Sequence, residues 1–146
     1  ATQQPDNLAL TYKLGALYER QGNLEEAKTA YGTVLARMDR REQKPGVKLY
    51  LLTVNRLALI CSSTGDTQRA LELLKTGAQI MPDDPHFYYQ IAGVYAGLND
   101  ESKAAQWLEE AIRRGFSDWA MIEKDTRWEK IRDTIYFQQL KNRALK

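Results

Sequence analysis

The sequence has few of the side chains on which most enzymes and metalloproteins depend. Its 146 residues include one cysteine, Cys61, and one histidine, His86. A single cysteine excludes an internal disulfide and says nothing about the redox compartment. Metal sites usually need several Cys or His ligands, and neither a calcium-loop pattern nor a glycine-rich phosphate loop occurs here. We therefore expect no catalytic residue, no metal and no cofactor, and we predict that the chain is not an enzyme.

Long apolar runs and a strong charge of either sign are also missing. Because no stretch of 18 or more apolar residues occurs, we expect no membrane insertion. The net charge is +2 at pH 7, with a pI of about 8.6. A nucleic-acid-binding face would normally be a strong basic stripe, so we expect no nucleic-acid partner. The 43% of hydrophobic residues is ordinary for a globular protein with a core.

Three stretches of the chain repeat one pattern: LGALYERQGNLEEAKTAY from Leu14, LALICSSTGDTQRALELL from Leu57, and IAGVYAGLNDESKAAQWL from Ile91. Four positions align, occupied by Gly15, Ala58 and Ala92; Tyr18, Cys61 and Tyr95; Ala27, Ala70 and Ala104; and Tyr31, Leu74 and Leu108. The second and third copies are 34 residues apart, and the first and second are 43 apart. Such a period indicates stacked helical hairpins.

Each copy has the local signals of two helices joined by a tight turn. Thr11, Leu14 and Tyr18 fall on one helical face. Gly15 on that face lets a neighbouring helix approach closely. Gly22, Gly65 and Asn99 can then take the left-handed conformation that ends a helix. Cys61 stands where the other copies have a core-facing tyrosine, so we expect a buried, inert thiol.

These residues resemble the tetratricopeptide repeat family, whose pattern is W-x2-L-G-x2-Y, then A-x3-F, then Pro. The tryptophan is missing from all three copies, where Thr11, Val54 and Tyr88 stand instead, and only the second copy ends in proline, Pro82. The resemblance implies an all-α fold: a right-handed α-solenoid of helix-turn-helix hairpins with C-terminal capping helices. We predict one domain over 1–146, with repeats at about 8–41, 47–82 and 85–115, and capping helices at about 117–144.

The extra residues between the first two copies are mostly charged and include a turn signal at Pro45-Gly46. We expect the second helix of copy one to run to about Arg41 and the chain to turn near Pro45. A longer hairpin is the favoured interpretation, and a protrusion that contacts a partner is the alternative. Residues 1–5 resemble the tail of a preceding repeat, because QQPDN precedes copy one much as IMPDDP precedes copy three. A fragment of a longer array is the favoured interpretation, and a short coil that mimics such a tail is the alternative.

The last thirty residues are rich in large apolar side chains, which suits a segment that closes the final hairpin. Ser117, Asp125 and Asp133 are the predicted N-caps of short helices. The segment is similar to the closing segment of many bacterial tetratricopeptide proteins, in which a Gly, an Asp and a late Phe recur. Gly115, Asp125 and Phe137 hold those places here.

In tetratricopeptide arrays the first helices of the hairpins line a concave groove that binds peptides or partner segments. We expect this groove on the helical face opposite the Leu14–Tyr18 stripe. The predicted partner-binding residues are Tyr12, Lys13, Ala16, Arg20, Asn55, Arg56, Leu59, His86, Tyr89, Gln90 and Gly93. They combine aromatic anchors, cations and small residues, and Tyr and Arg often dominate interface energy.

The favoured function is therefore a scaffold that binds a peptide or helix of a partner protein in this groove. The alternative is a self-associating structural or spacer module within a larger protein or a homo-oligomer. The family's chaperone-binding members hold a peptide carboxylate with a set of Lys, Asn and Arg residues. Those places carry Tyr12, Ala16, Arg56, His86 and Gln90 here, which argues against that partner class.

Overall fold

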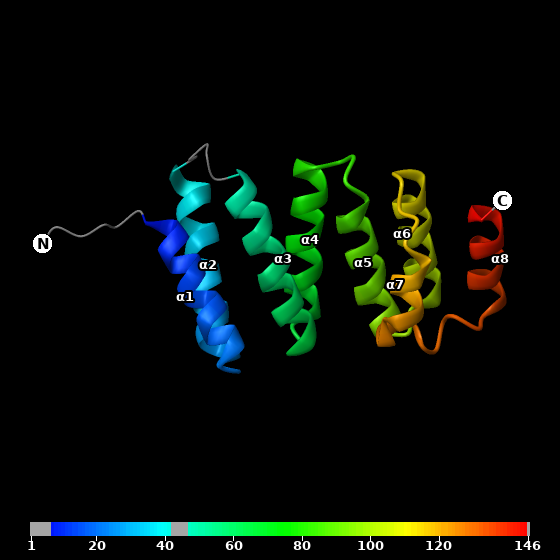
Figure 1. The fold of residues 1–146 in the computed structure, drawn as a ribbon, viewed down its shortest axis with the longest axis horizontal. Coiled ribbons are helices and arrows are strands. Elements are labelled where there is room, and N and C mark those ends of the chain that lie inside the picture. Colours follow the sequence, from blue (N-terminus) through cyan, green and yellow to red (C-terminus); the bar gives the residue numbers. More distant parts are fainter. Residues whose placement is uncertain (1–6, 42–46, 146) are drawn as a thin grey trace, which may run out of the picture. The chain divides into compact units, whose positions relative to one another are not determined.

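The structure is a computed structural model, and it describes residues 7–41 and 47–145. Over these residues all regular structure is helical (Figure 1). The helices are α1 (Leu8–Arg20), α2 (Leu24–Arg41), α3 (Val47–Ser63), α4 (Thr67–Ile80), α5 (Pro85–Gly97), α6 (Glu101–Arg113), α7 (Trp119–Lys124), the short 3-10 helix η2 (Thr126–Trp128) and α8 (Ile135–Ala144). The expected extension of α2 to Arg41 is confirmed. The predicted turn at Pro45-Gly46 and the interpretation of residues 1–5 lie outside the described residues.

The contacts divide the chain into two compact units, unit 1 (Ala1–Leu73) and unit 2 (Leu74–Lys146). The boundary falls inside α4, so this helix begins in unit 1 and ends in unit 2. Each unit has its own helical packing and is treated by itself below. The assignment of one domain to residues 1–146 stays a prediction.

Unit 1 is built around α2, which packs against both α1 and α3. Leu8 of α1 meets Val34 and Met38 of α2, and Leu49 and Tyr50 of α3 pack against this group. The expected close approach at Gly15 is confirmed, because a Cβ on Gly15 would lie 2.8 Å from the ring of Tyr31. The missing side chain therefore lets the buried Tyr31 ring of α2 lie directly on α1.

Gly15→Ala is expected to lower the free energy of unfolding by about 1–2 kcal/mol, although alanine is the better helix former. The added methyl group overlaps the ring of Tyr31, which is fully buried and whose hydroxyl is held by Glu19. Urea unfolding followed by circular dichroism measures the change. Gly32→Ala is the control, because its nearest neighbour would be the flexible end of Arg69 at 3.4 Å. A Gly15→Ala protein as stable as this control would contradict the close approach.

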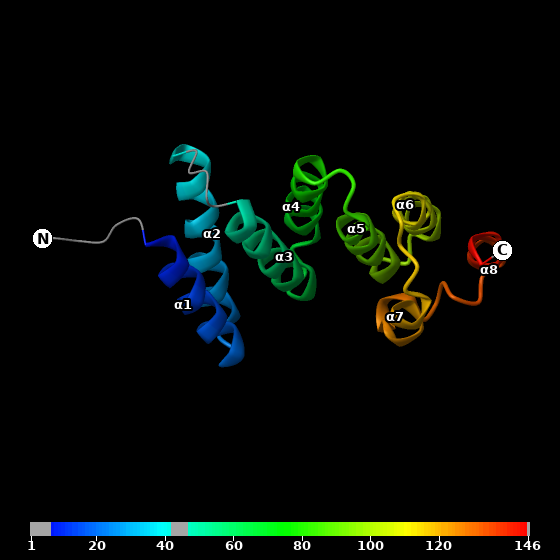
Figure 2. The same cartoon turned by 45° about the horizontal axis from the view of Figure 1, so that its top comes forward.

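Unit 2 joins the last hairpin to the C-terminal segment. α5 packs along α6, η2 packs against α5, and α8 packs against α6. In Figure 2, α6 lies between α5 and α8, and both of these helices pack against it. Gly77, in the second half of α4, lies against the ring of Phe87, and a Cβ at this position would overlap that ring.

The helix ends follow the sequence signals closely. Gly22, Gly65 and Asn99 have φ angles of 82°, 90° and 61°, so each takes the expected left-handed conformation. The Asp125 side chain caps η2 by accepting a hydrogen bond from the backbone N–H of Arg127, as predicted.

Two predicted caps in the C-terminal segment are wrong by one residue. Asp118, not Ser117, caps α7, and its Oδ1 accepts a hydrogen bond from the backbone N–H of Met121 at 3.0 Å. Thr134, not Asp133, caps α8. In both places two adjacent residues have side chains suited to capping, so sequence type alone does not decide between them.

Candidate functional site

The α5 face of unit 2, where the sequence predicts part of an open groove, is covered by the chain's own C-terminal segment. Tyr89 is only 1% exposed. Its ring stacks on Phe116 at a centroid distance of 4.7 Å and also faces Trp128 at 6.2 Å. Its hydroxyl donates a hydrogen bond of 2.6 Å to Oδ2 of Asp125. The expectation of an exposed aromatic anchor at Tyr89 is therefore corrected.

Arg127 covers the rest of the same face. Its Nε and Nη2 donate hydrogen bonds to the two carboxylate oxygens of Asp125 at 3.0 and 2.7 Å, and Nη2 also reaches Oε1 of Gln90 at 3.4 Å. A Cβ on Gly93 would overlap the guanidinium group. The small residue at position 93 thus makes room for Arg127 of the same chain, where the sequence had suggested room for a ligand.

Burial and the contacts within this cluster shift the pKa values of Asp125 and Tyr89. Burial raises the pKa of Asp125, but the hydrogen bonds from Arg127 and Tyr89 outweigh burial and hold that pKa below its ordinary value. Burial and the hydrogen bond to Asp125 both raise the pKa of Tyr89. At neutral pH the cluster is therefore a carboxylate–guanidinium pair with a neutral tyrosine, a structural arrangement with no group ready to exchange a proton.

His86 is the one predicted α5 residue that stays at the surface. It lies in the first turn of α5, and its Nε2 is 3.5 Å from Nε2 of Gln90. Because Tyr89 and Gly93 are covered, the predicted residues of α5 do not form an open binding face in this structure.

The predicted residues of unit 1 lie on α1 and α3, which an ion pair joins. Arg56 of α3 donates hydrogen bonds to the two carboxylate oxygens of Glu19 at 3.2 and 2.6 Å. The hydroxyl of Tyr31 donates to the same carboxylate at 2.9 Å, so Glu19 connects three helices. Burial and the hydrogen bond to Glu19 raise the pKa of Tyr31 to about 12. Glu19 is therefore fully engaged inside the unit.

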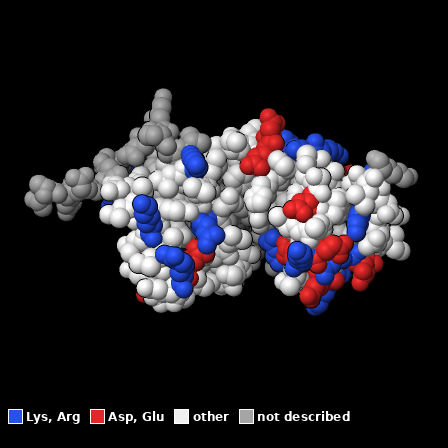
Figure 3. All heavy atoms as spheres, in the orientation of Figure 1, with Lys and Arg blue, Asp and Glu red and all other residues white. Residues whose placement is uncertain are grey.

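The surface around this ion pair is apolar and basic. We call it the α1–α3 face; it consists of Tyr12, Lys13, Ala16, Arg20, Leu52, Asn55, Arg56 and Leu59. Lys13, Arg20, Leu52, Arg56 and Leu59 are exposed, and the others are half-buried. Figure 3 shows basic side chains gathered over this part of unit 1, with one small acidic area among them. All predicted residues of α1 and α3 are thus accessible.

The described residues offer little to a catalytic or metal-binding interpretation. Cys61 is fully buried, and burial raises the pKa of its thiol, so it is protonated and inert at neutral pH. No group of three His, Cys, Asp or Glu side chains able to hold a metal ion occurs within residues 7–41 and 47–145. None of the helices in that part of the chain is long and apolar enough to cross a membrane.

Comparisons with known proteins decide the family. Two family models, both described as tetratricopeptide repeat, match residues 7–83 and residues 63–122. The chain belongs to the tetratricopeptide repeat family. No curated protein matches it in sequence.

A solved structure has a similar fold. The crystal structure of BtubC (BKLC) from P. vanneervenii superposes with a TM-score of 0.71 at 20% sequence identity. The match covers 99% of this chain and 64% of the BtubC chain, so the chain spans less than two thirds of that protein. At this identity the match establishes the helical repeat fold and nothing about the ligand.

Tetratricopeptide repeats are generally protein-interaction modules, and the family is typically a non-catalytic scaffold. The family therefore agrees with the predicted class of function. In this tetratricopeptide protein the α1–α3 face is the accessible part of the predicted site. Arg127, which covers the α5 part, is the residue that sequence reasoning missed, and Asp125, which pairs with it, was predicted only as a helix cap. The small residue Gly93 beside Tyr89 was a signal of close contact, but it does not identify which segment makes the contact.

Proposed function

We propose that this tetratricopeptide chain binds a helix or extended segment of a partner protein on the α1–α3 face. The observation that carries the proposal is the exposure of Leu52 and Leu59 on α3, the helix that the Arg56–Glu19 pair joins to α1. Two leucines on one face are anchors that a partner can bury at a substantial gain in free energy. Tyr89 and Gly93 of α5 are left out of the contact surface because the chain's own segment covers them.

The charge of the face indicates the character of the partner. Lys13 and Arg20 are exposed cations, and the acid among the neighbouring residues, Glu19, is paired with Arg56. The face is therefore electropositive, and it favours a segment that combines apolar anchors with acidic side chains. Complementary charge increases the association rate and selects among partners more than it increases affinity. Binding is expected to weaken as ionic strength rises.

Leu52→Gln combined with Leu59→Gln is expected to weaken partner binding at least tenfold, because each leucine loses apolar contact with the partner. The measurement is affinity capture from an extract of the source cells, with the bound proteins quantified by mass spectrometry. A partner that the unmodified chain captures and the double variant loses would support the proposal. The double variant is first checked for unchanged helicity by circular dichroism.

Leu14→Gln is the matched control, because Leu14, Leu52 and Leu59 are all leucines of unit 1 and are 44%, 42% and 43% exposed. This variant is expected to capture the partner normally, since Leu14 is not part of the α1–α3 face. Equal capture by the double variant and the unmodified chain would show that the α1–α3 face is the wrong surface. A mass that rises with protein concentration in light scattering would instead favour the self-associating alternative.

A further inference from the structure

The α1–α3 face carries two pairs of exposed side chains with the same spacing. On α1, Lys13 and Arg20 are exposed and lie seven residues apart; we call them the cationic row. On α3, Leu52 and Leu59 are 42% and 43% exposed and also lie seven residues apart; we call them the apolar row. Seven residues are close to two turns of an α-helix, so each pair lies on one side of its helix, about 10.5 Å apart along the axis.

The two rows lie next to each other because an ion pair joins their helices. Arg56 lies on α3 between the two leucines of the apolar row, and it donates hydrogen bonds to Glu19 of α1 at 3.2 and 2.6 Å. α1 and α3 run in the same direction in Figure 1 and in Figure 2. The cationic row and the apolar row therefore extend side by side along the face.

The cationic row is free to bind a partner. Among the described residues, no acid pairs with Lys13 or Arg20. Glu19, which lies between them on α1, is held by Arg56 and by the hydroxyl of Tyr31. The row therefore keeps its positive charge and offers two separate positions for carboxylates.

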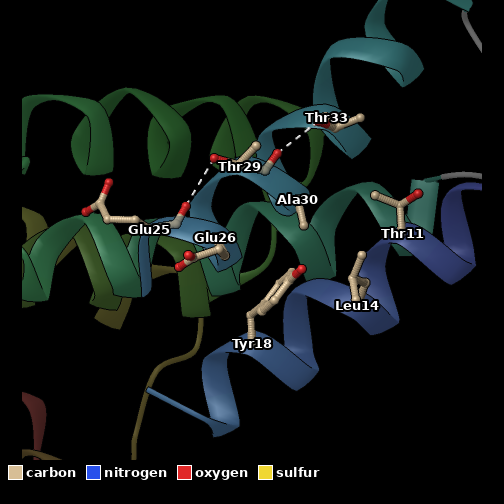
Figure 4. Close-up of a pocket in the computed structure, with 8 residues that line it drawn as sticks. All are labelled: Thr11, Leu14, Tyr18, Glu25, Glu26, Thr29, Ala30 and Thr33. Carbon is tan, nitrogen blue, oxygen red and sulfur yellow. Dashed lines mark hydrogen bonds between the residues drawn. The ribbon is translucent and has the colours of Figure 1, made fainter. Parts of the chain in front are cut away.

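A different side of α1 borders α2. There Leu14 and Tyr18 help to line an open groove of about 460 Å³, and Figure 4 shows both side chains directed toward the side of α2 that carries Ala30. Neither Lys13 nor Arg20 lines this groove. A substitution at Leu14 therefore changes exposed apolar surface on α1 without changing either row.

The spacing of the rows decides which partner conformation fits them. In an α-helix, side chains seven residues apart lie on one side and have the same separation of about 10.5 Å. An extended strand covers about 10 Å in three residues, and side chains three residues apart point to opposite faces of a strand. A polyproline helix repeats every three residues, or about 9.3 Å, which falls short of the spacing by about 1 Å. The rows therefore fit an α-helix best.

We propose that the α1–α3 face binds a single amphipathic α-helix of the partner protein, with an apolar residue every seven positions against Leu52 and Leu59. On the adjoining strip of the same helix, an acidic residue every seven positions lies against Lys13 and Arg20. This inference rests on the proposed function, because it assigns the conformation and the residue pattern of the segment that binds to this face.

The test uses a labelled alanine-rich peptide of about 20 residues, which is long enough to form a helix in water. It has a leucine at every seventh position and, on the adjoining strip, a glutamate at every seventh position. Fluorescence anisotropy with the full chain is expected to show saturable binding with a Kd below about 1 mM. Leu52→Gln combined with Leu59→Gln should weaken this binding at least about tenfold, and Leu14→Gln should leave it unchanged.

Charge reversal tests the cationic row. Lys13→Glu combined with Arg20→Glu should weaken binding of the glutamate peptide about tenfold. The same variant should bind a second peptide in which lysine replaces each glutamate. Lys124→Glu combined with Lys130→Glu is the control, because it makes the same change of net charge at two exposed lysines of unit 2. At physiological ionic strength this control should bind the glutamate peptide normally, since distant exposed charges are screened.

Two further peptides test the helical conformation. One has the same composition, with the glutamates moved to the opposite side of the helix. The other has a proline in the middle, which breaks the helix and keeps the leucines and glutamates. Both peptides should bind at least about tenfold more weakly than the first peptide.

Three results would overturn the inference. The first is equally tight binding of the proline peptide, because the bound segment would then not be a helix. The second is no saturable binding of the first peptide up to about 1 mM, or binding that Leu52→Gln with Leu59→Gln does not weaken. The third is undiminished binding by the charge-reversed variant. The proposed function fails separately, when capture of a partner from the cell extract does not depend on Leu52 and Leu59.

Discussion

Replacing Trp128 with alanine is expected to lower the free energy of unfolding by about 4 kcal/mol. Trp128 is fully buried in unit 2, facing Tyr89 at a centroid distance of 6.2 Å and Phe137 at 5.8 Å. No described residue accepts a hydrogen bond from its buried indole N–H. The whole loss of unfolding free energy therefore comes from packing and from the cavity that the ring leaves. Urea unfolding followed by circular dichroism measures this loss.

Trp119→Ala is the control for this experiment. Trp119 is half-buried and meets Phe137 edge-on at a centroid distance of 6.0 Å, so its loss should cost about 1 kcal/mol. The two variants remove the same side chain from the same segment at different depths. If Trp128→Ala were no more destabilising than Trp119→Ala, the C-terminal segment would not form the core of unit 2.

Asp125→Asn is expected to cost about 3 kcal/mol at pH 7, because it leaves the largely buried guanidinium of Arg127 without its counter-charge. The pKa of Asp125 is lowered in the folded state, so its contribution is fully present above the unfolded pKa of about 3.9. The contribution is lost as the pH falls through the lower folded pKa. The difference in unfolding free energy between the two proteins should therefore be constant at pH 5–7 and shrink below about pH 4.

Asp118→Asn is the matched control, because asparagine caps a helix about as well as aspartate. Asp118 is exposed, and the cap it provides to Met121 needs only a side-chain oxygen. Its replacement should change the unfolding free energy by less than about 0.5 kcal/mol. Equal effects of the two substitutions, or an Asp125→Asn effect that persists unchanged at pH 3, would mean that the Arg127 pair does not stabilise unit 2.

The repeat pattern predicted the helices well because its signals are local. Gly22, Gly65 and Asn99 end helices by their backbone conformation, which depends on the residue itself. Gly15 marked a close helix contact, and the ring of Tyr31 lies there. The one-residue errors at Ser117 and Asp133 arose where two adjacent residues have side chains suited to capping. Such choices depend on tertiary contacts that the local sequence does not contain.

The candidate site was predicted only in part because burial depends on contacts between distant segments. The face of α5 that carries Tyr89 and Gly93 has the residue types of a binding surface, and nothing in α5 itself shows that Arg127 will cover it. The exposure of Leu14 was also not predicted, because its pattern matches that of the buried Leu57 and Ile91. Periodicity identifies the face of a helix, but it does not identify what covers that face.

We propose the α1–α3 face as the surface that contacts a partner protein. The most direct measurement places a photo-crosslinking amino acid at Leu59, and in a second protein at Gln106, an exposed position on α6. Each protein is illuminated in the source cells, and adducts are identified by mass spectrometry. A specific adduct is expected from position 59 and none from position 106. Adducts of equal yield from both positions, or only from position 106, would show that the α1–α3 face is not the contact surface.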